Sequence, residues 1–245
     1  MSLSNDKLSR FCFLSIRLII PNTRTGAIIQ HMNTYDPVLF DLDGTLVDSG
    51  ADIASAVNRT LRTLGMDELA PSEIIGYVGD GVRKLMQRTL AGQGQDKIDQ
   101  AIASFKNDYF SRCLEATTPY DGIVQILERI KDKRMAVVTN KPVAYARQIL
   151  QGLDLLGYFD AVVGGDEAEL KPNPAPIVLA LHRMDCDSSG GIMVGDHSND
   201  ILAGKAAGLA TCGVTWGLDH GQSIKDAKSD HICTTPEQLA KVLGI

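Results

Sequence analysis

The stretch VLFDLDGTLVDS, residues 38–49, joins a short apolar run to two aspartates and a glycine-threonine turn. The run Val38–Phe40 is apolar at every position, as expected of a strand that is buried on both faces of a parallel sheet. Asp41 and Asp43 follow where this strand ends. Ligands of open α/β sheets bind at the carboxyl ends of the strands, so the stretch predicts a functional site that starts with two carboxylates.

Similar apolar runs recur along the chain and alternate with segments of helical periodicity. The predicted strands are Val38–Phe40, Met135–Val138, Ala161–Val163, Ile192–Val194 and Thr211–Val214. Amphipathic segments begin at Ile123, after Pro142 and around Ile177. Thr235, with Gln238 three residues later, predicts a capping box at the start of a last helix. The alternation predicts an α/β fold with a doubly wound, Rossmann-like parallel sheet.

The interval between the first two runs departs from this alternation. No convincing strand is visible between Asp48 and Tyr120, but apolar residues recur there at helical spacing, for example around Ile53, Val82 and Ile98. The pattern predicts an all-helical cap domain at residues 48–118, inserted into a core domain formed by residues 32–47 and 119–245. The sequence TPYDG at 118–122 predicts a return hinge.

Residues 1–31 differ from the remainder of the chain. Their apolar run, Phe11–Ile20, is interrupted by Arg17 and is shorter than the roughly 20 residues of a transmembrane helix. We interpret the segment as an N-terminal extension that is either not native, with Met32 as the natural start, or disordered. A docked helix or strand is the second interpretation. A secretion signal is the third, although no small-residue cleavage site follows closely.

The composition excludes several classes of protein. The chain has 245 residues, of which 44% are hydrophobic and 22% charged, which excludes collagenous, disordered and disulfide-scaffold proteins. Its net charge is -6 and it carries no basic block, so we expect no nucleic acid and no membrane as partners. The 5 cysteines are odd in number and form no C-x-x-C pair, which favours a cytoplasmic location. We expect a monomer or a homodimer.

Polar residues also follow the later predicted strands. Thr139 and Asn140 come after the second, Lys171 lies in the loop after the third, and Asp196 and Asp200 come after the fourth. Each has a simpler interpretation by itself: Thr139 and Asn140 as turn residues, Lys171 as a solvated lysine, and Asp200 as a helix start. Parallel strands end at the same edge of a sheet, so the joint arrangement favours one site.

The residue types indicate phosphoryl chemistry. Asp41, Asp43 and Asp196 packed together would raise one another's pKa values unless a cation intervened, and hard oxygen ligands suit Mg²⁺. A carboxylate neutralised in this way can attack phosphorus, which predicts Asp41 as the nucleophile of an aspartyl-phosphate. Asp43 would protonate the leaving oxygen and then activate water. Lys171, Thr139 and Asn140 would hold the phosphoryl oxygens.

From Val38 to the C-terminus the sequence resembles the haloacid dehalogenase superfamily. The four motifs of that superfamily correspond to residues 41–49 (DLDGTLVDS), Thr139, Lys171 and the segment from Gly195-Asp196 to Asp200. The resemblance implies that Asp41 is the nucleophile and Asp43 the general acid and base. It implies that Mg²⁺ is held by Asp41, the backbone carbonyl of Asp43 and Asp196, with Asp200 close by. The helical insertion matches the cap of such proteins.

Within the superfamily, the sequence is most similar to bacterial phosphoglycolate phosphatases. Three stretches carry this likeness: TNKP at 139–142, KPNPAP at 171–176 and GDHSND at 195–200. The resemblance implies a phosphatase that acts on a small phosphorylated metabolite, with 2-phosphoglycolate as substrate and glycolate as product. Asp43 agrees with this reaction type, because a poor alkoxide leaving group needs a proton donor.

Three other functions remain as alternatives on the same core. A phosphosugar mutase and an inorganic pyrophosphatase share its catalytic residues. A non-catalytic phosphate-binding protein would have a broken catalytic set, whereas here the set is complete.

Substrate specificity is expected to come from the helical insertion. The glycine-rich segment GYVGDG, residues 76–81, precedes Arg83 and Lys84. One interpretation is a loop that enters the site, with Arg83 or Lys84 meeting a carboxylate of the substrate. The alternative is a loop that joins two helices and carries a solvated basic pair.

Overall fold

The computed structural model describes residues 35–219, 221 and 223–245, and these residues belong to one compact unit. The predictions for residues 1–31 lie outside this part of the chain. None of the described helices is long and apolar enough to cross a bilayer.

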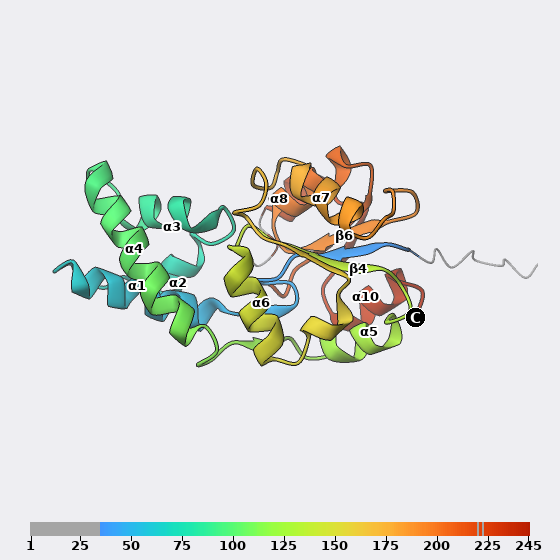
Figure 1. The fold of residues 1–245 in the computed structure, drawn as a ribbon, viewed down its shortest axis with the longest axis horizontal. Coiled ribbons are helices and arrows are strands. Elements are labelled where there is room, and N and C mark those ends of the chain that lie inside the picture. Colours follow the sequence, from blue (N-terminus) through green and yellow to red (C-terminus); the bar gives the residue numbers. More distant parts are fainter. Residues whose placement is uncertain (1–34, 220, 222) are drawn as a thin grey trace, which may run out of the picture. The chain divides into compact units, whose positions relative to one another are not determined.

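Six parallel strands form the main sheet, in the spatial order β5-β4-β1-β6-β7-β8 (Figure 1). The strands are β1 (Val38–Phe40), β4 (Met135–Val138), β5 (Ala161–Val163), β6 (Ile192–Gly195), β7 (Ala210–Val214) and β8 (His231–Cys233). Strand β1 lies between β4 and β6, so the chain winds outward on both sides of it and the predicted doubly wound α/β fold is confirmed. Strand β8 was not predicted, because this edge strand is only partly buried and lacks a continuous apolar run.

Helices cover both faces of the sheet. One face packs against α5 (Ile123–Arg129), α6 (Val143–Gly152) and α10 (Pro236–Val242), and the other against α7 (Ala175–Arg183) and α8 (Ser198–Ala206), as Figure 1 shows. Short helical turns lie at Leu156–Tyr158 and at α9 (Ile224–Ala227). Successive side chains of β1 point to opposite faces of the sheet. Val38 and Phe40 belong to the hydrophobic core beneath α5, α6 and α10, and Leu39 belongs to the core beneath α7 and α8.

The last helix begins as the sequence predicts, but with half of the capping box. The Thr235 hydroxyl accepts a hydrogen bond from the backbone N–H of Gln238 at 3.4 Å. The Gln238 side chain, however, accepts from the backbone N–H of Thr234 at 2.8 Å rather than from that of Thr235.

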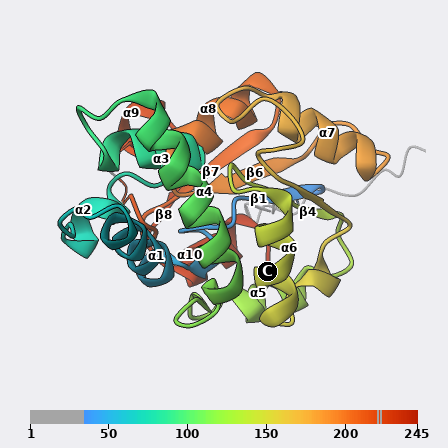
Figure 2. The same cartoon turned by 60° about the vertical axis from the view of Figure 1, so that its left-hand side comes forward.

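Four helices follow β1 before the chain returns to the core at Thr118, and we call them the helical insertion: α1 (Gly50–Thr63), α2 (Pro71–Ile75), α3 (Gly81–Thr89) and α4 (Gln95–Arg112). Figure 2 shows these helices grouped together. The chain enters and leaves the insertion through two short antiparallel strands, β2 (Val47–Asp48) and β3 (Thr118–Pro119). No strand was predicted between Asp48 and Tyr120, and β3 corrects this; two residues are too few to produce a periodic pattern. The division of the chain into separate core and cap domains stays a prediction.

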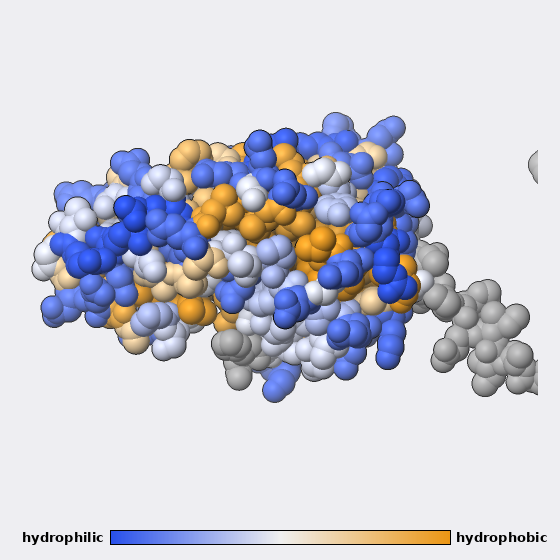
Figure 3. Space-filling model, turned by 90° about the horizontal axis from the view of Figure 1, so that it is seen from below, coloured by the Kyte–Doolittle hydropathy of each residue, from blue (hydrophilic) through white to orange (hydrophobic). Residues whose placement is uncertain are grey.

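Partly exposed apolar side chains come from separate elements. Polar residues cover much of the face seen in Figure 3, with an apolar area between them. Phe110 of α4, Val124 of α5 and Ile232 of β8 are among the exposed large apolar residues. Single apolar residues at the surface are normal in globular proteins.

A buried aspartate ties the start of the insertion to its end. The Asp52 carboxylate, on α1, accepts hydrogen bonds from the backbone N–H groups of Ala116 and Thr117, each at 2.9 Å, and from the Thr117 hydroxyl at 2.7 Å. Asp52 is 4% exposed, so these donors have little access to water. Asp52 therefore holds the returning chain against α1 just before β3.

We predict that Asp52→Ala destabilises the protein by about 3 kcal/mol, because it leaves buried donors without an acceptor. Urea unfolding measures the loss. Asp67→Ala, at an exposed position, is the matched control and should stay within about 0.5 kcal/mol of wild type. Equal stability of the two variants would contradict the role of Asp52.

Candidate active site

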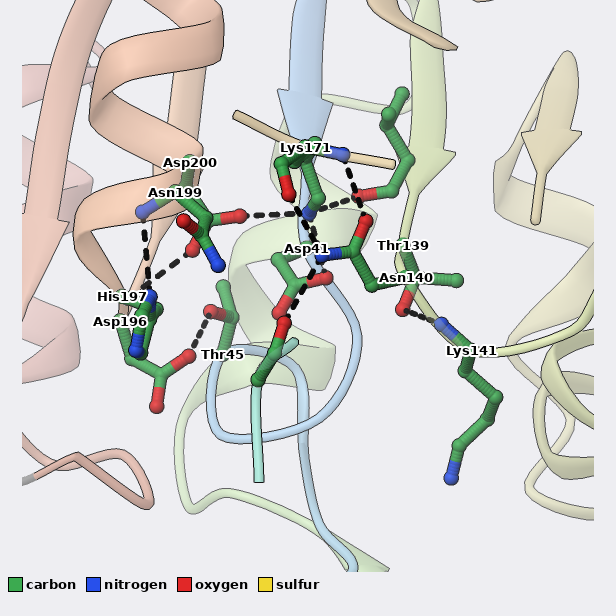
Figure 4. Close-up of polar contacts among 12 residues, drawn as sticks. Asp41, Thr45, Thr139, Asn140, Lys141, Lys171, Asp196, His197, Asn199 and Asp200 are labelled. Carbon is green, nitrogen blue, oxygen red and sulfur yellow. Dashed lines mark hydrogen bonds and ion pairs between the residues drawn. The ribbon is translucent and has the colours of Figure 1, made fainter. Parts of the chain in front are cut away.

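A buried lysine joins the ends of three strands. Lys171 Nζ lies 2.9 Å from Asp41 Oδ1 and 2.6 Å from Asp200 Oδ1, and it donates to the Val138 carbonyl oxygen at 2.5 Å (Figure 4). Asp41 follows β1, Val138 ends β4, and Asp200 lies in the first turn of α8, after β6. The structure thus brings the predicted residues Asp41, Lys171 and Asp200 together, and each N–H of the ammonium has an acceptor.

Two glycine-containing loops surround the carboxylate of Asp196. Asp196 Oδ2 accepts from the backbone N–H of Leu218 at 2.9 Å, and Oδ1 lies 3.4 Å from the Thr45 hydroxyl. A Cβ atom at Gly44 would lie 2.1 Å from Asp196 Oδ2, and one at Gly217 would lie 2.4 Å from it. Gly44 also has a φ of +84°, which favours glycine. Close backbone approach from both loops therefore fixes this carboxylate.

Three carboxylates form the candidate metal site. Asp41, Asp196 and Asp200 are buried, and each offers an oxygen within 4.8 Å of the others. Burial raises the pKa of Asp41 to about 7, against the lowering effect of Lys171, and the charges of Asp200 and Asp43 add to the rise. Burial, with the charges of Asp41 and Asp200, raises the pKa of Asp196 well above its usual range.

One ammonium group does not balance this cluster. Lys171 pairs with Asp41 and Asp200, and no described residue places a cation beside Asp196, whose charge faces them. Carboxylate oxygens at this spacing are hard ligands that suit a divalent cation such as Mg²⁺. The donor set therefore fits the predicted metal.

Thr139 and Asn140 have different surroundings at the end of β4. Thr139 is buried, lines the cavity and accepts from the backbone N–H of Lys141 at 3.2 Å. The Asn140 amide donates to the carbonyl oxygens of Gly79 and Lys171 at 2.9 and 3.0 Å, and its oxygen accepts from the Lys171 backbone N–H. Asn140 thus positions the Lys171 backbone and joins it to the helical insertion; its contact with phosphate stays a prediction.

Lys141 lies in the site, although the sequence analysis did not select it. It is 9% exposed, its Nζ lies 2.8 Å from Asp43 Oδ1, and it donates to the Tyr109 hydroxyl at 2.6 Å. Asp43 Oδ1 also accepts from the Ser49 hydroxyl. Burial would lower the pKa of Lys141, but Asp43 and Tyr109 raise it above its ordinary value. The signals in the sequence were its place directly after Thr139 and Asn140, which follow β4, and inside the stretch TNKP at 139–142 that resembles phosphatases.

The helical insertion closes the other side of the cavity. Val82, Leu85, Phe105 and Tyr109 line it, together with Gly79 and Gly81 of the glycine-rich loop. This loop reaches the site as predicted, since a Cβ at Gly79 would lie 3.0 Å from the His197 ring.

Arg83 and Lys84 do not reach the cavity. Both are exposed, and Arg83 pairs with Asp99 of α4 at 2.9 Å. Neither side chain lines the cavity, because both lie on the outer side of α3 while Val82 and Leu85 face inward. The role of Arg83 and Lys84 in specificity stays a prediction without a contact to support it.

The loop is also attached to α8. Asp80 Oδ1 accepts from the Asn199 amide at 2.7 Å, and its other oxygen pairs with Arg88. Partial burial would raise the pKa of Asp80, but these two partners lower it below its ordinary value. Asp80 therefore joins the insertion to the strand-end side of the sheet as an ionised carboxylate.

The sequence is similar to those of known phosphatases. Phosphoglycolate phosphatase from Aquifex aeolicus is 38% identical over 210 residues, covering 84% of this chain and 95% of the relative. Phosphoglycolate phosphatase from Neisseria meningitidis is 38% identical over 200 residues, covering 78% and 84%.

Solved structures share the fold. A predicted phosphoglycolate phosphatase from Haemophilus somnus matches with a TM-score of 0.79 and 28% identity, over 85% of this chain and 98% of that protein. A predicted phosphatase from Clostridium acetobutylicum matches with a TM-score of 0.77 and 28% identity, over 86% and 99%. The family model "Haloacid dehalogenase-like hydrolase" matches residues 38–214, more than half of the chain. The chain belongs to the haloacid dehalogenase-like hydrolase family.

Proposed function

We propose that the protein is a Mg²⁺-dependent phosphatase that hydrolyses a small organic phosphate monoester, 2-phosphoglycolate, to glycolate and phosphate. The observation that carries the proposal is the buried Asp41 carboxylate, held 2.9 Å from Lys171, with Asp43 two residues along the chain. The curated relatives named above carry the name phosphoglycolate phosphatase, which supports the substrate.

Asp41 is the proposed nucleophile. Its carboxylate oxygen forms a bond to phosphorus while the bond between phosphorus and the ester oxygen breaks, which gives an aspartyl-phosphate. Lys171 lies between Asp41 and Asp200, and its positive charge would offset negative charge on the phosphoryl oxygens, one of which would replace a present acceptor. Thr139 lines the same cavity and offers its hydroxyl to another.

A metal completes this arrangement. Asp41, Asp196, Asp200 and the backbone carbonyl of Asp43 are the proposed ligands. When bound, Mg²⁺ supplies positive charge that offsets the carboxylates and the phosphoryl oxygens.

Asp43 is the proposed proton donor and acceptor. It gives a proton to the leaving alkoxide in the first step, and it takes one from water when that water attacks the aspartyl-phosphate. The Ser49 hydroxyl and Lys141 contact its Oδ1 and orient it. The apolar side chains Val82, Leu85 and Phe105 line the cavity and limit the water that reaches the intermediate.

Asp41→Asn tests the nucleophile. We expect phosphate release from 2-phosphoglycolate in Mg²⁺ to fall at least about 1,000-fold, because an amide cannot form the acyl phosphate. Asp67→Asn, at an exposed position, is the control and should keep wild-type activity. Near-wild-type turnover by Asp41→Asn would contradict the assignment. If wild type isomerised a phosphosugar, or cleaved pyrophosphate, in preference to hydrolysing 2-phosphoglycolate, one of the alternative functions would be favoured.

Asp43→Asn tests the proton donor through the leaving group. We expect kcat/KM to fall about 1,000-fold for 2-phosphoglycolate but far less for p-nitrophenyl phosphate, whose phenolate leaves without protonation. The quantity kcat/KM reports the first step, so the comparison isolates leaving-group protonation. Equal losses for the two esters would show that Asp43 does not protonate the leaving group.

Metal removal and pH test the carboxylate cluster. The folded-state pKa of Asp41 is raised from 3.8 to about 7, so the folded protein binds an extra proton between these values and loses stability as pH rises through them. Asp41→Asn lacks this carboxyl group and should not lose stability in this way. In EDTA, we therefore expect the melting temperature of wild type to fall by several degrees relative to that of Asp41→Asn as pH rises from 5 to 8.

Excess Mg²⁺ should reduce this difference, because it binds and stabilises the folded wild type more strongly than the variant. A difference that stays constant with pH in EDTA, or is unchanged by Mg²⁺, would contradict the proposed ligand set. Thermal unfolding of both proteins, in EDTA and in excess Mg²⁺, measures this difference in melting temperature.

A further inference from the structure

The cavity contains two buried lysines whose donors are used differently. The ammonium of Lys171 has three acceptors: Asp41, Asp200 and the Val138 carbonyl. Lys141 has two partners among the described residues, Asp43 at 2.8 Å and the Tyr109 hydroxyl at 2.6 Å. An ammonium carries three N–H donors, so one donor of Lys141 has no acceptor in this part of the chain.

Tyr109 offers a second donor at the same place. Its oxygen accepts from Lys141, which cannot accept in return, and its own O–H has no acceptor among the residues that the structure describes. Burial raises the pKa of Tyr109, so the hydroxyl keeps its proton. Lys141 and Tyr109 therefore present one N–H and one O–H side by side on the cavity wall.

This pair lies away from the carboxylate cluster. Figure 4 shows the Lys141 side chain extending from the end of β4 away from Asp41, Lys171 and Asp200. Its ammonium reaches α4 of the insertion, where it also lies 4.6 Å from the centre of the Tyr109 ring. A substrate with its phosphoryl group at Asp41 would thus present its other end to Lys141 and Tyr109.

We propose that Lys141 and Tyr109 form the subsite that recognises the carboxylate of a small phosphorylated carboxylic acid. Their two donors match the two oxygens of one carboxylate. A second phosphate group would bring more negative charge than one lysine balances, and the described residues that line the cavity include no arginine. The inference rests on the proposed phosphatase function and names its specificity-determining residues.

Two esters of similar size test the subsite. 2-Phosphoglycolate carries a carboxylate, and 2-hydroxyethyl phosphate carries a neutral hydroxymethyl group at the same position. We expect wild type to prefer 2-phosphoglycolate in kcat/KM. Lys141→Met loses the contact with Asp43 and is expected to lower turnover of both esters, but kcat/KM for 2-phosphoglycolate should fall about 100-fold further than kcat/KM for the neutral ester, mainly through KM.

Tyr109→Phe removes a single oxygen and tests the same subsite independently, should Lys141→Met fail to fold. We expect it to lower the preference for the carboxylate about 10-fold. Lys106→Met is the matched control, since Lys106 lies on the same helix, is exposed and does not line the cavity. It should leave both esters unaffected.

The outcomes distinguish a failure of the carboxylate subsite from a failure of the proposed phosphatase function. Equal losses on both esters in the variants would show that Lys141 and Tyr109 act only on Asp43 or on the fold, and would overturn the subsite. Wild-type hydrolysis without preference for the carboxylate would overturn it too. A wild-type protein that releases no phosphate from either ester in Mg²⁺ would contradict the proposed function itself.

Discussion

A buried ammonium between two carboxylates holds the site together. Lys171 can be buried because Asp41, Asp200 and the Val138 carbonyl satisfy all of its N–H groups. An unpaired charge at this depth would cost several kcal/mol, so loss of any partner weakens the others. Because the partners come from the ends of β1 and β4 and from the start of α8, this one interaction fixes three loops relative to one another.

Around Lys171, buried carboxylates outnumber the ammonium group that pairs with them, so the cluster carries an excess of negative charge. Asp41 and Asp196 are buried beside Asp200, and their raised pKa values show how strongly the site resists full ionisation by itself. A divalent cation bound by these carboxylates would offset their negative charge and favour the ionised form of Asp41. The close approach of Gly44 and Gly217 to Asp196 keeps the cluster from relaxing outward, so the arrangement is preorganised for phosphoryl transfer.

The two halves of the cavity have separate tasks. The strand ends supply Asp41, Lys171 and the cluster of carboxylates, whereas the helical insertion supplies apolar walls and Tyr109. Asn140 and Asp80 connect the halves through bonds to Gly79 and Asn199. In the proposed phosphatase, the strand ends carry the phosphoryl chemistry, and Tyr109 of the insertion together with Lys141 contacts the organic group.

Sequence pattern alone was sufficient for the sheet core and for the edge where Asp41, Thr139 and Asp196 meet, because buried parallel strands leave continuous apolar runs and all end on the same side. It missed β8 and β3, whose exposed or very short segments carry no such run. It offered Arg83 or Lys84 as one possible contact for a substrate carboxylate, and both are exposed in the structure; it did not select Lys141, which is buried beside Asp43. Whether a lysine is solvated or enclosed depends on which helix packs over it, and α4 meets the end of β4 only in the folded chain.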